Sequence, residues 1–337
     1  MAILVTGGLG YIGSHTVIEL IKQGYDPIVV DNLSNAKEEM VDQIKAISGK
    51  KIKYYIADLL DKEKLDEIFK ENPDIEDVIH FAGSKAVGES CVKPLLYYEN
   101  NLMSTINLLN AMIKYKVKNI IFSSSATVYG TPKRVPIVED DPIGGTTNPY
   151  GTTKLIIEGI LQDVYKVHPE MNIALLRYFN PIGAHESGLI GEAPNGIPNN
   201  LMPYITQVAI GQREKLNVFG DDYNTPDGTG VRDYIHVVDL ALGHVATIKK
   251  LHQNSGLVIY NLGTSKGTSV LELVHAFEDA NGIKVPYVIA PRRPGDIAEC
   301  YADCSKALKE LNWKAERSIV DACRDSWRWQ KYFSSKK

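Results

Sequence analysis

The first half of the chain alternates between short apolar runs and longer segments whose pattern suits helices. Six runs are rich in branched apolar residues, as in parallel strands that are covered on both faces: residues 2–6, 27–31, 52–57, 77–82, 119–124 and 172–179. Strand–helix alternation of this kind is typical of βαβ units. The pattern therefore predicts an α/β fold built on a doubly wound parallel sheet.

The pattern changes after Phe179. Residues 180–200 are rich in Gly, Pro and Asn and have no clear period, which indicates a domain boundary and a functional loop. Shorter elements follow, and an amphipathic helix is expected over residues 318–333. We therefore expect a first domain over residues 1–180 and a smaller C-terminal α/β substrate domain over residues 181–337. Some C-terminal segments are expected to return to the first domain.

Composition narrows the possible functions. The net charge of −4 comes from interspersed acids and bases, so no basic stripe suggests nucleic-acid binding. No apolar run approaches the ~18 residues of a membrane span, and the first residues lack the basic leader of a signal peptide. Four scattered cysteines fit a reduced cytoplasmic protein. Cys300 and Cys304 lack a second pair, so no metal site is expected.

A glycine-rich turn follows the first predicted strand and opens a helix. Gly7, Gly10 and Gly13 let the backbone approach a pyrophosphate at the helix N-terminus, where free N–H groups attract anions. Asp31 ends the second predicted strand, where a carboxylate accepts hydrogen bonds from an adenosine ribose. Because this carboxylate would repel a 2′-phosphate, the motif predicts a Rossmann fold that prefers NAD to NADP.

Other candidate cofactor residues follow strand ends, where doubly wound sheets bind their ligands. Two asparagines extend the Asp31 loop, and further candidates follow the third and fourth predicted strands: Asn32, Asn35, Asp58, Leu59, Phe81, Ala82 and Lys85. Asp58 with the Leu59 backbone could reach an adenine. The alternative for Asp58 is a helix cap.

Tyr150 and Lys154 are spaced one helical turn apart, directly behind Pro149. A proline in the first turn favours a helix start, so the two side chains are expected on one helix face. Two other pairs share this spacing, but the first contains a proline and the second lies in a polar tail: Tyr129–Lys133 and Tyr332–Lys336. Tyr150 and Lys154 are therefore the candidates for chemistry.

Taken together, the motifs resemble the extended short-chain dehydrogenase/reductase family. They comprise the glycine turn, Asp31, Ser125 and the Tyr150–Lys154 pair. Within this family the chain resembles the branch that epimerises UDP-hexoses at C4, through further blocks in both halves: residues 80–90, 123–130, 148–154, 177–185 and 227–241. The resemblance spans residue 5 to about residue 305, which is nearly the whole chain.

The resemblance implies a catalytic set of Ser125, Tyr150 and Lys154. Tyr150 would take the proton of the sugar 4-hydroxyl while hydride passes from C4 to NAD. A free phenol has a pKa near 10, so ionisation at neutral pH needs a shift of about 3 units, or roughly 4 kcal/mol. Two positive charges could supply it, Lys154 and the oxidised nicotinamide. Lys154 would also bind the nicotinamide ribose, and Ser125 would hydrogen-bond the substrate oxygen.

The resemblance also implies ligand contacts. Further cofactor contacts fall on Tyr11, Ile12, Asn100 and Tyr178. Substrate contacts fall on Ser125, Asn180, Asn200, Leu201, Val218, Phe219, Arg232, Arg293, Asp296 and Cys300. The two arginines can grip a diphosphate bidentately, and the Asn180 amide can donate to it. Asp296 can accept from the uridine ribose, while Val218 and Phe219 can flank uracil.

Two other functions compete with a 4-epimerase. A nucleotide-sugar 4,6-dehydratase of the same family needs an acid for the leaving hydroxyl and usually carries an Asp-Glu pair after the central Ser or Thr. Here Ser125 is followed by Ala126 and Thr127. The second alternative is a non-catalytic NAD-binding protein, which has no use for an intact Ser–Tyr–Lys set.

Cys300 departs from the family pattern, because many relatives have a tyrosine at this border of the hexose pocket. The smaller cysteine would leave room for an N-acetyl group at C2, which predicts activity on UDP-GlcNAc/UDP-GalNAc as well as UDP-Glc/UDP-Gal. The alternative is that Cys300 is simply a small buried residue.

The helices expected near residues 94–115 and 150–168 carry apolar stripes. The resemblance implies a homodimer that forms through a helix bundle.

Overall fold

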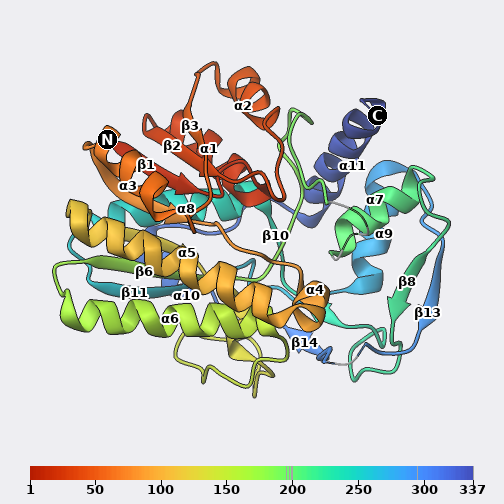
Figure 1. The fold of residues 1–337 in the computed structure, drawn as a ribbon. Helices are drawn as coiled ribbons and strands as arrows, with labels where there is room; N and C mark the ends of the chain where they lie inside the picture. Colours follow the sequence, from red (N-terminus) through yellow and green to blue (C-terminus); the bar gives the residue numbers. More distant parts are fainter. Residues whose placement is uncertain (195, 197, 199, 294, 337) are drawn as a thin grey trace.

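A parallel sheet of seven strands lies at the centre of the larger, mostly N-terminal part of the molecule, the first layer (Figure 1). The computed structural model describes residues 1–194, 196, 198, 200–293 and 295–336. In sheet order the strands are β11 (Leu257–Leu262), β6 (Asn172–Tyr178), β5 (Asn119–Ser123), β4 (Ile75–His80), β1 (Ala2–Thr6), β2 (Asp26–Asp31) and β3 (Lys53–Ile56). All neighbouring pairs are parallel, so the predicted fold class is confirmed.

Six of these strands lie within two residues of their predicted bounds, but β11 was not predicted. It pairs in parallel with β6, from Leu257 opposite Ile173 to Leu262 opposite Tyr178. Its first three residues are only half-buried, as suits an edge strand, and its apolar pattern is correspondingly weak. Because β11 lies far beyond residue 180, the sheet draws on both predicted domains. The boundary at residue 180 stays a prediction.

Helices cover both faces of the sheet. One face carries α1 (Tyr11–Lys22), α2 (Met40–Ser48), α8 (Val237–Leu251) and α10 (Ser305–Leu311), which share a core with the strands. The other face carries α3 (Lys62–Glu71), α5 (Pro94–Tyr115) and α6 (Pro149–Val167) around a second core. The short helix α4 (Val87–Val92) precedes α5, and a 3₁₀ turn, η1 (Ala126–Tyr129), follows β5. No helix among the described residues is long and apolar enough to cross a membrane.

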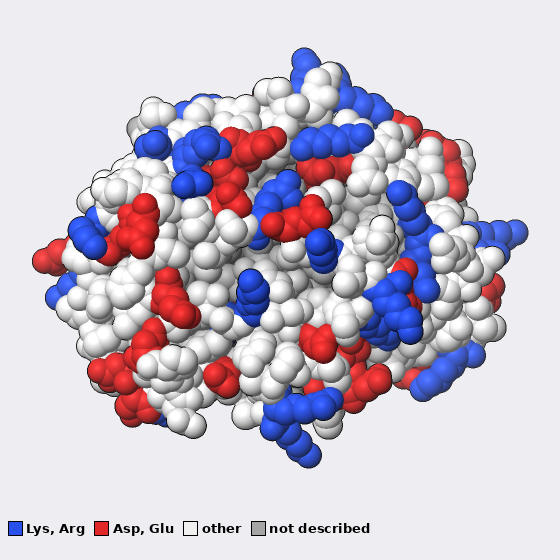
Figure 2. Space-filling model, turned by 180° about the vertical axis from the view of Figure 1, so that it is seen from behind, with Lys and Arg blue, Asp and Glu red and all other residues white. Residues whose placement is uncertain are grey.

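The C-terminal part forms a smaller α/β layer with a core of its own. Its helices are α7 (Leu201–Ala209), α9 (Val270–Asn281) and α11 (Ile319–Ser335). Its strands form three short sheets: β7 (Asn180–Ile182) with β10 (Tyr234–His236), β8 (Leu216–Phe219) with β13 (Tyr287–Ala290), and β9 (Val231–Arg232) between β12 (Thr268–Ser269) and β14 (Glu299–Cys300). On the face shown in Figure 2, acidic and basic side chains are interspersed.

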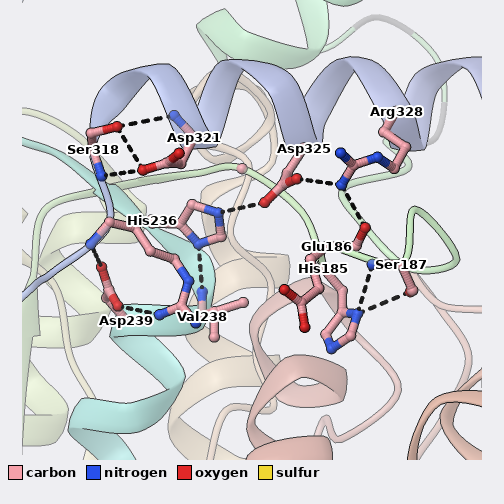
Figure 3. Close-up of polar contacts among 12 residues, drawn as sticks. His185, Glu186, Ser187, His236, Val238, Asp239, Ser318, Asp321, Asp325 and Arg328 are labelled. Carbon is pink, nitrogen blue, oxygen red and sulfur yellow. Dashed lines mark hydrogen bonds and ion pairs between the residues drawn. The ribbon is translucent and has the colours of Figure 1, made fainter.

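Polar contacts tie helix α11 to the first layer (Figure 3). His236 caps α8 by accepting from the Val238 N–H at 3.1 Å, and its Nε2 lies 3.4 Å from Asp325 of α11. Buried Asp239 accepts from Arg317 and from the backbone N–H groups of Glu316 and Arg317 just before α11. These contacts join helix α11 of the C-terminal part to helix α8 on the seven-stranded sheet.

Candidate functional site

The glycine turn after β1 brings the backbone close to helix α1. Gly7 has φ +68°, and a Cβ there would lie 2.8 Å from the Ala82 nitrogen. A Cβ on Gly13 would lie 2.2 Å from the Gly7 carbonyl oxygen. Helix α1 starts after Gly10 without a side-chain cap, so its first N–H groups can face an anion. The turn therefore fits the pyrophosphate of a dinucleotide.

Asp31 closes the same turn. Its carboxylate accepts from the Leu9 N–H at 3.0 Å and from the Leu33 N–H at 2.9 Å. Burial raises the pKa of this carboxyl, while the backbone N–H groups oppose the shift. A carboxylate oxygen has capacity for further donors, so Asp31 can both order the turn and accept from a ribose hydroxyl.

Asp58 does not cap the helix that follows it. Helix α3 is capped by Asp61, which accepts from the Lys64 N–H at 3.0 Å. Asp58 instead accepts from the Asn32 side chain at 2.9 Å and so joins the loops after β2 and β3. The helix-cap alternative for Asp58 is wrong.

The structure brings all the predicted cofactor residues to one cleft of roughly 950 Å³ at the carboxyl ends of the strands. They are Gly7, Gly10, Tyr11, Ile12, Gly13, Asp31, Asn32, Asn35, Asp58, Leu59, Phe81, Ala82, Lys85, Asn100, Tyr150, Lys154 and Tyr178. Sequence reasoning missed Val30, Ser34, Ala36, Ala57, Gly83 and Ser104, which also line the cleft. Most of these follow strand ends, which is a usable signal, whereas Ser104 reaches the cleft from within α5.

Tyr150 and Lys154 lie one turn apart on α6. The helix begins where predicted, because Asn148 caps it by accepting from the Gly151 N–H at 2.8 Å and Pro149 occupies its first turn. The Lys154 ammonium lies 5.9 Å from the Tyr150 ring centroid and donates to the Ser123 carbonyl at 2.6 Å.

Burial shifts the pKa values of both side chains toward their neutral forms. Burial raises the pKa of Tyr150 well above its ordinary value, although a hydrogen bond with Ser125 works in the opposite direction. Burial also lowers the pKa of Lys154 to about 8, against the attraction of Glu158. The sequence-based expectation assigned the ionisation of Tyr150 to two positive charges, Lys154 and the oxidised nicotinamide, and it stays a prediction.

The predicted substrate residues lie on several C-terminal elements. Arg232 and Cys300 are register partners on β9 and β14. Arg293 forms an ion pair with Asp296 at 2.9 Å, and its guanidinium lies 4.8 Å from the Phe219 ring centroid. These contacts gather the arginine, the acid and the aromatic ring that were predicted to hold a nucleotide.

Other substrate candidates lie at the starts of β7 and α7 or in the C-terminal core. Exposed Asn180 begins β7, and Leu201 begins α7. Asn200 donates to Glu192 at 2.8 Å. Val218 is 1% exposed and packs in the C-terminal core, so its side chain does not flank a base in this arrangement. The remaining substrate contacts stay predictions.

The sheet, the glycine turn and the Tyr–Lys pair together define a member of the extended short-chain dehydrogenase/reductase family. Residues 4–326 match the family model described as GDP-mannose 4,6 dehydratase. Individual relatives place the chain more narrowly than this broad family model does. The chain is 61% identical over 330 residues to a UDP-glucose 4-epimerase of Bacillus subtilis, and the match covers 98% of this chain and 97% of the relative.

Solved structures give the same assignment. UDP-glucose 4-epimerase from Bifidobacterium longum, in complex with NAD+ and UDP, superposes with a TM-score of 0.95 at 56% identity and full coverage of both chains. The UDP-Glc/GlcNAc 4-epimerase of Campylobacter jejuni superposes with a TM-score of 0.85 at 35% identity, over 98% of this chain and 99% of that one. The chain therefore belongs to the UDP-glucose 4-epimerase family.

Proposed function

We propose that the protein interconverts UDP-glucose and UDP-galactose with NAD as a bound cofactor. The observation that carries the proposal is a single cleft that holds the glycine turn, Asp31 and the Tyr150–Lys154 pair. The name and the NAD+ and UDP complex of the Bifidobacterium longum relative support the same reaction. NAD, when bound, takes the hydride of the sugar C4 and returns it within one turnover.

Tyr150 is the base of this reaction. Its phenol removes the proton of the sugar 4-hydroxyl, and Ser125 hydrogen-bonds the oxygen that becomes the ketone. Lys154 supplies a positive charge near the ring of Tyr150. Burial works against ionisation of the phenol, so the positive nicotinamide of bound NAD would have to supply the rest of the stabilisation. Tyr150 then returns the proton after the 4-ketone has turned.

Inversion at C4 requires that the 4-ketone present its opposite face to the cofactor. This is possible when binding energy falls mainly on the UDP and the hexose is held loosely. Arg232, Arg293 and Asn180 are the groups that would hold the diphosphate, because guanidinium and amide donors match its oxygens. Asp296 would accept from the uridine ribose, and Phe219 would pack against uracil.

Tyr150→Phe tests the catalytic assignment. Loss of a positioned general base typically costs 10²–10⁴-fold, so we expect kcat to fall by at least about 100-fold. The assay is conversion of UDP-galactose without added NAD, followed by product analysis. Unchanged NAD content and melting temperature would show that the variant is folded. Turnover within a few-fold of the wild-type rate would refute the role of Tyr150.

The same assay separates the two alternatives. A 4,6-dehydratase would release a 4-keto-6-deoxy sugar, but it needs an acid, and residues 126 and 127 are alanine and threonine. A non-catalytic NAD-binding protein would leave UDP-galactose unconverted. The contacts of Tyr150 with Ser125 and Lys154 favour an enzyme over a non-catalytic protein, and the missing acid favours the epimerase over the dehydratase.

A wider substrate range is part of the proposal. Cys300 is half-buried beside Arg232, and burial raises the pKa of its thiol to about 11, so it acts as a small neutral residue. Its size would leave room for an N-acetyl group. Epimerisation of UDP-GlcNAc should be measurable and should fall in Cys300→Tyr, while UDP-galactose turnover persists. Activity on UDP-GlcNAc that does not fall in this variant would refute the argument.

We also propose that the protein is a homodimer formed by the helices on the α5–α6 face. Large apolar side chains on α4, α5 and α6 are exposed, with Val92 at 79%, Leu95 at 80% and Val167 at 75%. Exposed apolar side chains on neighbouring helices often mark an interface with another chain. Light scattering should give twice the chain mass, and Leu95→Glu should lower it. A monomeric mass for the wild type at working concentration would contradict the dimer.

A further inference from the structure

Three consecutive serines at the end of β5 are each tied to helix α6. The Ser123 carbonyl accepts from Lys154 at 2.6 Å, and the Ser125 hydroxyl hydrogen-bonds Tyr150. Between them, the fully buried Ser124 donates to Glu158 Oε1 at 2.6 Å. The middle contact therefore lies between the two that hold the proposed catalytic side chains.

Glu158 is itself held firmly. Arg177 of β6 donates its Nη2 to Glu158 Oε2 at 2.7 Å and its Nε to Oε1 at 3.0 Å, and both side chains are almost completely buried. The guanidinium also donates to the Tyr129 hydroxyl at 3.1 Å and to the Glu139 carbonyl at 3.0 Å. A bidentate pair with these extra donors fixes the position of the carboxylate.

We propose that Glu158 is a positioning residue for the reaction. Through the Ser124 hydroxyl it fixes the end of β5, and with it the carbonyl that holds Lys154 and the hydroxyl that meets Tyr150. Among the described residues, Glu158 contacts Ser124 and Arg177 and none of the predicted substrate residues, so we infer that it acts through the serines. This inference rests on the proposed epimerase function and extends it to a residue behind the catalytic set.

Two physical arguments support a role beyond stability. A buried ion pair contributes little stability, because desolvation of both charges offsets their attraction, and apolar residues often replace it without loss. A misplacement of about 1 Å at a catalytic group, in contrast, can cost about 100-fold in rate. We therefore expect the Glu158–Arg177 pair to contribute more to catalysis, by holding the Ser123–Ser125 segment, than to the stability of the fold.

Glu158 also affects the charge of Lys154. The titratable and charged groups that interact with Lys154 come from α6, β4 and α8: Tyr150, Glu158, His80 and His244. Of these groups, Glu158 is the carboxylate, and it favours the ammonium form of Lys154 against burial. Because kcat should decline when the Lys154 ammonium loses its proton at alkaline pH, loss of Glu158 should move this decline, the alkaline limb of the kcat profile, to lower pH.

The test replaces the charged pair by apolar side chains of similar size, in Glu158→Leu/Arg177→Met. Because no unpaired charge remains, the variant is expected to fold and to retain NAD. We expect kcat on UDP-galactose to fall by at least about 10-fold, with KM within about 3-fold of wild type. The alkaline limb should move to lower pH. A purely structural pair predicts wild-type kcat and an unchanged profile in a folded, NAD-loaded variant, which would overturn the inference.

Ser124→Ala removes the same link and leaves the ion pair intact. Its kcat should fall in the same direction, and adding it to the double variant should cause little further loss, because both changes break one connection. Ser326→Ala is the matched control, since Ser326 is a buried serine on α11, outside the proposed site. If the double variant does not fold, Ser124→Ala decides alone, and kcat within 2-fold of wild type would overturn the inference. A wild-type protein that leaves UDP-galactose unconverted would instead refute the proposed function.

Discussion

Replacing Gly13 by alanine should weaken NAD binding. An ideal Cβ at this position lies 2.2 Å from the Gly7 carbonyl oxygen and 2.8 Å from the Gly8 Cα, and real contacts of this kind are not shorter than 3.0 Å. The turn must therefore retreat from α1 by roughly 0.8 Å even to reach that limit. It cannot retreat freely, because the Gly7 N–H is bonded to the Val30 carbonyl at 2.7 Å.

The size of the effect follows from overpacking. Forcing an extra methyl into a close-packed site costs about 1–3 kcal/mol. If the turn relieves this strain by moving away from the helix, its N–H groups leave the position that a pyrophosphate requires. Binding then weakens by the same free energy, which corresponds to an increase of about 5- to 150-fold in the Kd for NAD.

Titration of cofactor-stripped protein with NAD measures this Kd, and the NAD that copurifies with the variant gives a second readout. Gly159→Ala is the matched control, because a Cβ on this α6 glycine meets nothing within 4 Å and alanine is the better helix former. This control should keep the wild-type Kd. A Gly13→Ala variant with a Kd within 2-fold of wild type would refute the argument from close approach.

Three further predictions follow from the structure. Asp31→Ala removes a charged acceptor and should raise the Kd for NAD by about 10-fold or more while narrowing the preference over NADP, as titrations with both cofactors would measure; an unchanged preference would contradict the role of the carboxylate. Burial lowers the pKa of Lys154 to about 8, so its ammonium is present below that pH and is lost above it. We therefore expect kcat to decline as the pH rises through about 8. Lys154→Met should lower kcat at pH 7 and abolish this decline at alkaline pH. Asp239→Ala removes the acceptor of the Glu316 and Arg317 backbone N–H groups and should lower the free energy of unfolding by about 1–3 kcal/mol in denaturant titrations, with little change in kcat per folded molecule.

The local sequence pattern was sufficient for most of the first layer. Six strands were expected close to their observed bounds, and so were helices α5, α6 and α11. The glycine turn, Asp31 and the Tyr150–Lys154 spacing are also local, because each depends on a strand end or on one turn of a helix. Residues of this kind can be recognised before any long-range contact is known.

Residues brought in from distant segments could not be recognised in this way. Strand β11 has a weak pattern because it lies at the sheet edge, and its place beside β6 depends on pairing across about eighty residues of sequence. Ser104 lines the cleft because of how α5 packs, and Glu158 contacts Ser124 because α6 lies against the end of β5. Nothing in the local sequence around these residues separates them from ordinary helix positions.

The amino-acid sequence by itself determined the α/β class, the cofactor turn and the candidate proton-transfer residues, because periodicity, glycine and residue spacing act over a few positions. The tertiary structure decided which face each helix covers, how deeply Tyr150 and Lys154 are buried, and hence that both pKa values shift toward the neutral forms. Burial and charge depend on every element packed around a site, and for that reason they are properties of the folded chain.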